Sequence, residues 1–108
     1  MPLLSFDDLE RDVLPTLTRY CEIPSLSPMF DADWATTGYL NDAAELIAQW
    51  ARERALANAE VQIHRLEGRT TVVTVTLPAT NAATGTCVLY GHLDKQPPLG
   101  DWSEGLGP

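Results

Sequence analysis

The spacing of apolar residues changes near residue 60, and this change does most to limit the folds open to the chain. Before that point apolar side chains recur at steps of three and four, which is the period of a helix. After it they alternate one by one, which is the period of a half-buried strand. Helices followed by strands predict an α/β sheet domain. The 108 residues leave room for one small domain, taken as residues 1–108.

Two helices are predicted. The first covers residues 5–22, with Ser5 as its N-cap and a kink at Pro15, which lacks the amide that would bond to Arg11. Pro24 ends it. The second covers about residues 35–56, and its apolar stripe is expected to pack on the sheet as core. The stripe consists of Leu40, Ala43, Ala44, Ile47, Trp50 and Ala51.

Three strands follow. Val61 and Ile63 alternate with polar residues, as do the apolar residues of 73–77, and Glu67-Gly68-Arg69 supplies a turn between them. This pattern predicts a half-exposed antiparallel hairpin. Residues 86–91 are apolar throughout apart from their ends, so a third strand covered on both faces is expected there.

Composition excludes some classes of function. The net charge is −8 and Lys95 is the single lysine, so a nucleic-acid surface is not expected. No apolar run approaches the roughly 18–20 residues of a membrane span. The acidic N-terminus lacks the layout of a signal peptide, so we expect a cytoplasmic protein. Cys21 and Cys87 are expected to be reduced thiols in the core rather than a disulfide.

His92 and Asp94 are the candidate functional residues. They follow the predicted third strand, and residues at i and i+2 of an extended backbone face the same side. A carboxylate that holds one imidazole nitrogen and leaves the other for a metal is a common zinc arrangement. The alternative is a simple hydrogen bond at a strand end, because His-x-Asp is a common tripeptide. His64 lies in the half-exposed hairpin and is expected to be solvated. A zinc site takes three or four protein ligands, and no spacing in the sequence completes one.

The stretch from Val88 to Pro98, followed by Gly100 to Pro108, resembles the zinc-dependent exopeptidase family. This family includes carnosinase-type dipeptidases, glutamate carboxypeptidase, aminoacylase and succinyl-diaminopimelate desuccinylase. Its members carry an apolar strand ending in Gly-His-x-Asp, then a proline and a Trp-rich loop closing in proline. The run Cys21 to Ser27, with Ile-Pro-Ser, is similar to the family's early segment. Lys95 departs from the pattern, because many members have an apolar residue there.

The resemblance implies the first part of a three-layer catalytic domain, with two helices, a hairpin and one buried strand. It implies that His92 binds one of two zinc ions and that Asp94 is the catalytic-site carboxylate that orients it. The implied reaction is hydrolysis of a peptide or N-acyl amino acid next to a free carboxylate. The family's other ligands, its general base and its lid domain have no counterpart in these 108 residues, so we expect no peptidase activity from this chain alone.

Two other interpretations remain open. The chain can be a non-catalytic interaction or oligomerisation module that retains the motif, or a plain α/β domain with a chance His-x-Asp. A reading frame that continues with Gly-Arg-Gly and paired aspartates would favour the enzyme, and a stop codon would favour the module. Because the strand at 86–91 has few predicted neighbours, we also expect self-association by strand addition. No membrane partner is expected.

Overall fold

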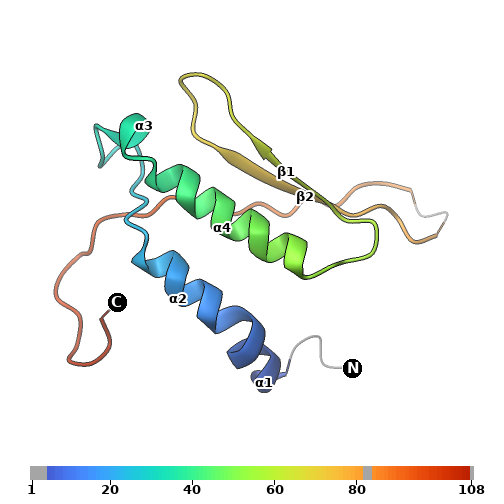
Figure 1. Cartoon of the computed structure of the whole chain (residues 1–108), viewed down its shortest axis with the longest axis horizontal. Helices are drawn as coiled ribbons and strands as arrows, with labels where there is room; N and C mark the ends of the chain where they lie inside the picture. Colours follow the sequence, from blue (N-terminus) through green and yellow to red (C-terminus); the bar gives the residue numbers. More distant parts are fainter. Residues whose placement is uncertain (1–4, 82–83, 108) are drawn as a thin grey trace.

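The computed structural model describes residues 5–81 and 84–107. Helical segments come first: α1 (Phe6–Asp8), the π-helical turn η1 (Leu9–Val13), α2 (Leu14–Glu22), α3 (Trp34–Thr37) and α4 (Tyr39–Glu53). Strands β1 (Glu60–His64) and β2 (Val72–Thr76) follow. Figure 1 shows α4 between α2 on one side and the hairpin of β1 and β2 on the other. Helix α4 contacts α2 and both strands. Helices and a small antiparallel sheet are compatible with the predicted α/β class.

The first helix spans the predicted residues but is not a plain α-helix. Ser5 caps it as predicted, because its hydroxyl accepts from the Asp8 amide at 3.1 Å and the Asp8 carboxylate accepts from the Ser5 amide. A kink was predicted at Pro15, and the irregularity lies just before it. In η1 the amide of Leu14 donates to the carbonyl of Leu9, five residues back. Pro15 has no amide to donate to the Arg11 carbonyl, and the π-helical turn lies directly before this break in the α-helical hydrogen-bond pattern.

The second predicted helix is broken near its start. Gly38 has a φ of 81° and separates α3 from α4, so the predicted single helix over 35–56 is interrupted near its start. Helix α4 also ends at Glu53, before the predicted end at residue 56. At the other end, Ala55 has a φ of 48°, which is incompatible with a continuing right-handed helix. The buried apolar residues of α4 are Leu40, Ala43, Ala44 and Ala48. Half of the predicted stripe, Leu40, Ala43 and Ala44, is therefore core, whereas Ile47, Trp50 and Ala51 are only half-buried.

The hairpin forms as predicted. Strand β1 pairs antiparallel with β2, with Val61 opposite Val75 and Ile63 opposite Val73. These four side chains lie on one face of the hairpin. Val61, Ile63 and Val73 are half-buried, and Val75 is 43 % exposed. Because α4 contacts both strands, it covers this face in part.

The predicted third strand is wrong. Residues 86–91 belong to neither strand of the sheet, and Val88, Leu89 and Tyr90 are 81 %, 93 % and 91 % exposed. A strand needs backbone partners on a neighbour, and within the described residues the sheet contains only β1 and β2. The apolar run is therefore an extended, uncovered segment rather than the centre of a sheet.

Both cysteines are free thiols, but neither lies in the core, so that part of the prediction is wrong. Cys21 sits on an exposed face of α2, and Cys87 belongs to the exposed segment. Among the described residues, no helix is long and apolar enough to cross a membrane.

Candidate metal-ligand pair at His92 and Asp94

The side chains of His92 and Asp94 meet. Nδ1 of His92 lies 3.0 Å from Oδ1 of Asp94 and 2.9 Å from the backbone carbonyl oxygen of the same residue. Both oxygens are acceptors, so Nδ1 must carry the proton and donate. The neutral imidazole then has its free lone pair on Nε2. This is the tautomer in which a histidine binds a metal through Nε2.

The pair is open to solvent on the histidine side. The His92 side chain is 71 % exposed and that of Asp94 is 37 % exposed. Among residues 5–81 and 84–107, no hydrogen bond uses Nε2 of His92. The ring is thus held at one nitrogen and accessible at the other, as a metal ligand requires.

Contacts with the end of α2 position the pair, and no strand takes part. Residues 26 and 95 form an isolated parallel bridge, in which the Ser27 amide donates to the Lys95 carbonyl at 2.9 Å. Tyr20 Oη donates to the carbonyl of Leu93 at 2.8 Å. Residues 93–95 are therefore fixed on the C-terminal side of His92, although residues 86–91 on its other side are exposed.

The Lys95 ammonium group lies at the C-terminal end of α2. Its Nζ donates to the carbonyls of Tyr20 and Ile23 and to Oγ of Ser25. It also lies 4.0 Å from the centroid of the Tyr20 ring. Burial lowers the pKa of Lys95 below its ordinary value. Burial also raises the pKa of Tyr20, with smaller contributions from the neighbouring charges of Cys21 and Asp94.

The sequence singled out His92 and Asp94 but missed the residues that hold them. Tyr20 and Ser25 gave no sign of a role, because their partners lie about seventy residues away. One usable clue was present: the single lysine of the chain directly follows Asp94. His64 is exposed, as predicted, and its Nε2 lies 2.9 Å from Oγ1 of Thr74 rather than beside a carboxylate.

The pair does not form a complete metal site within the described residues. No group of three or more His, Cys, Asp or Glu side chains in residues 5–81 and 84–107 can hold a metal ion. His92 fits the chemistry of one zinc ligand, because its side chain is 71 % exposed and its Nε2 takes part in no hydrogen bond among the described residues. Asp94 fits the role of the carboxylate that orients it.

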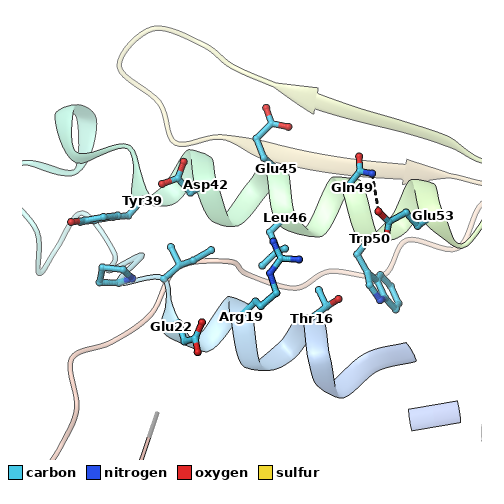
Figure 2. A pocket seen from close by; sticks show the side chains of 12 residues that line it. Thr16, Arg19, Glu22, Tyr39, Asp42, Glu45, Leu46, Gln49, Trp50 and Glu53 are labelled. Atoms are coloured by element: carbon cyan, nitrogen blue, oxygen red, sulfur yellow. Dashed lines mark hydrogen bonds between the residues drawn. The ribbon is translucent and has the colours of Figure 1, made fainter. Parts of the chain in front are cut away.

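A separate groove of about 660 Å³ runs between α2 and α4 (Figure 2). Four carboxylates and one guanidinium line it, and a hydrogen bond of 2.8 Å joins Gln49 to Glu53 at one end. Trp50 lines the same end, and its indole nitrogen donates to the backbone carbonyl of Asp12 at 2.7 Å. Neither His92 nor Asp94 borders the groove, so the groove and the candidate metal-ligand pair are separate sites.

No protein-family model matches this chain, and no curated protein matches it.

Proposed function

We propose that the chain is the N-terminal segment of a dinuclear-zinc hydrolase that cleaves peptide or amide bonds next to a free carboxylate. The observation that supports this most is the imidazole of His92, held at Nδ1 by Asp94 and exposed at Nε2. The resemblance of the Gly-His-x-Asp run and the upstream Ile-Pro-Ser segment to zinc-dependent exopeptidases supports the reaction class.

In this proposal His92 supplies one nitrogen ligand to one zinc ion. Asp94 keeps the proton on Nδ1, so that the lone pair on Nε2 is left for the metal. Zinc, when bound, would activate water and polarise the scissile carbonyl. The general base and the remaining ligands would come from residues outside the 108.

The test is a Zn²⁺ titration followed by the imidazole ¹H–¹⁵N signals of the two histidines. We expect saturable changes at His92 and none at His64, whose partner is the hydroxyl of Thr74. In the matched variants zinc binding is measured by calorimetry: His92→Ala should abolish saturable binding, and His64→Ala should leave it intact. Equal responses at both histidines, or binding that survives His92→Ala, would overturn the proposal.

A second candidate is a non-catalytic module that pairs with another copy of the chain. The exposed apolar side chains of Val88, Leu89 and Tyr90 favour it, because such a segment can add as a strand to a neighbour. In that case His92 has no role in binding zinc, so the titration separates the two candidates. The compartment proposed for either is the cytoplasm.

A further inference from the structure

We propose that Tyr20 and Lys95 are positioning residues that hold the His92–Asp94 pair in its metal-binding geometry, a role that rests on the proposed function of His92 as a zinc ligand. Within residues 5–81 and 84–107, neither residue forms a hydrogen bond with the imidazole itself. They act through the backbone of residues 93–95, which they fasten to the end of helix α2.

The fastening is a set of hydrogen bonds between residues 20–27 and residues 93–95, here called the 20–95 clamp. Two hydroxyls donate to the carbonyl of Leu93: that of Tyr20 at 2.8 Å and that of Ser25 at 3.4 Å. The Lys95 amide donates to the Ser25 carbonyl at 2.9 Å, and Ser25 is fully buried. The backbone is therefore tied both before and after Asp94.

The Lys95 side chain closes the clamp from the opposite direction. The last carbonyls of a helix have no partner within the helix. Lys95 Nζ donates to two carbonyls at the end of α2, those of Tyr20 and Ile23, and so caps α2 from a distant part of the chain. The same ammonium group lies over the Tyr20 ring. Tyr20 thus contributes its carbonyl, its ring and its hydroxyl to one cluster.

The clamp matters for His92 because of where the imidazole is held. Both acceptors for Nδ1 belong to Asp94: its carboxylate and its backbone carbonyl. That backbone carbonyl lies between Leu93, which Tyr20 holds, and Lys95, which holds α2. On the other side of His92, residues 86–90 are exposed and lie outside the sheet, so they offer little restraint. Release of Leu93 should therefore let residue 94 turn and let Nδ1 lose its acceptors.

The central experiment compares Tyr20→Phe with the wild-type chain, using two readouts. In the metal-free chain, long-range ¹H–¹⁵N spectra report the tautomer of His92. In the presence of Zn²⁺, the titration of the same signals gives the dissociation constant. Phe keeps the ring beneath Lys95 and removes only the hydroxyl that donates to Leu93. Loss of a hydrogen bond of ordinary strength should weaken zinc binding about fivefold. The Nε2–H tautomer should also appear.

Tyr39→Phe is the matched control. Tyr39 is a more exposed tyrosine at the start of α4, where it borders the groove, and it takes no part in the 20–95 clamp. This variant should leave both readouts as in the wild type. Far-UV circular dichroism must show unchanged helix content in each variant. A tautomer change in such a variant then cannot be attributed to a generally weakened fold.

The outcomes separate this proposal from the proposed function. If Tyr20→Phe changes neither the tautomer nor the zinc affinity, the positioning role is overturned while zinc binding at His92 stands. If the wild type does not bind zinc at His92, the proposed function fails, and the tautomer in the metal-free variants still decides whether the clamp orients the ring. If Tyr20→Phe loses helix, Lys95→Met is measured by the same tautomer signal; an unchanged tautomer in that folded variant would overturn the clamp.

Discussion

Replacing Leu89 by Ala tests the largest difference between the sequence prediction and the structure. A leucine in a buried central strand would lose about 2–5 kcal/mol of stability on truncation to alanine. In the structure Leu89 is 93 % exposed, so the methyl groups removed are already in water. The free energy of unfolding should therefore change by less than about 0.5 kcal/mol.

Leu40→Ala is the matched control, because the same side chain is 9 % exposed in the core of α4. Three carbon groups leave the core, and at about 0.8 kcal/mol each they predict a loss of roughly 2–3 kcal/mol. The assay is urea unfolding followed by far-UV circular dichroism. With an m value of about 1–1.5 kcal/mol/M, Leu40→Ala should lower the midpoint by about 2 M.

Leu89→Ala should leave the midpoint within about 0.5 M of the wild type, given the same m value. Measurement at two protein concentrations separates any effect on self-association from an effect on folding. A Leu89→Ala shift as large as that of Leu40→Ala at both concentrations would refute the exposed placement of residues 86–91.

Three further predictions concern the N-terminal cap, the oligomeric state and activity. The pKa of Asp8 is lowered from 3.8 to about 2, chiefly by the Ser5 hydroxyl, so its stabilising contribution is present above 3.8 and is lost as the pH falls towards 2. Ser5→Ala should raise this pKa in an NMR titration, and an unchanged value would contradict the capping box. Sedimentation should show concentration-dependent association that Leu89→Lys reduces, because residues 86–91 expose apolar side chains and lie outside the sheet; a monomer at all concentrations would count against it. The 108-residue chain should not hydrolyse amides with added zinc, and turnover that disappears in His92→Ala would show that a base is present after all.

The elements that the sequence predicted well are those set by local chemistry. Ser5 lies three residues before Asp8, so both partners of the capping box are visible in the sequence. The hairpin follows from alternation and a turn, and its register, with Val61 opposite Val75, keeps the alternating apolar residues of both strands on one face. The meeting of His92 with Asp94 is local too, because two residues separate them.

The features that the sequence did not reveal depend on distant partners or on single backbone angles. An apolar run such as residues 86–91 shows a preference for burial, but not whether neighbouring strands are there to cover it. The break before α4 depends on one positive φ at Gly38, which leaves no mark on the apolar spacing. The clamp joins Tyr20 to Leu93 across 73 positions of sequence, and no periodicity reports a contact of that kind.

The protonation of the His92 ring is the most direct test of the account, because zinc binding and the role of Asp94 both depend on it. Long-range ¹H–¹⁵N spectra of the metal-free wild-type chain above pH 8 should show a proton on Nδ1 and an unprotonated Nε2. Asp94→Ala should shift the population towards the Nε2–H form. A wild-type ring protonated mainly at Nε2, or one that Asp94→Ala leaves unchanged, would contradict the orientation from which the proposed zinc ligand follows.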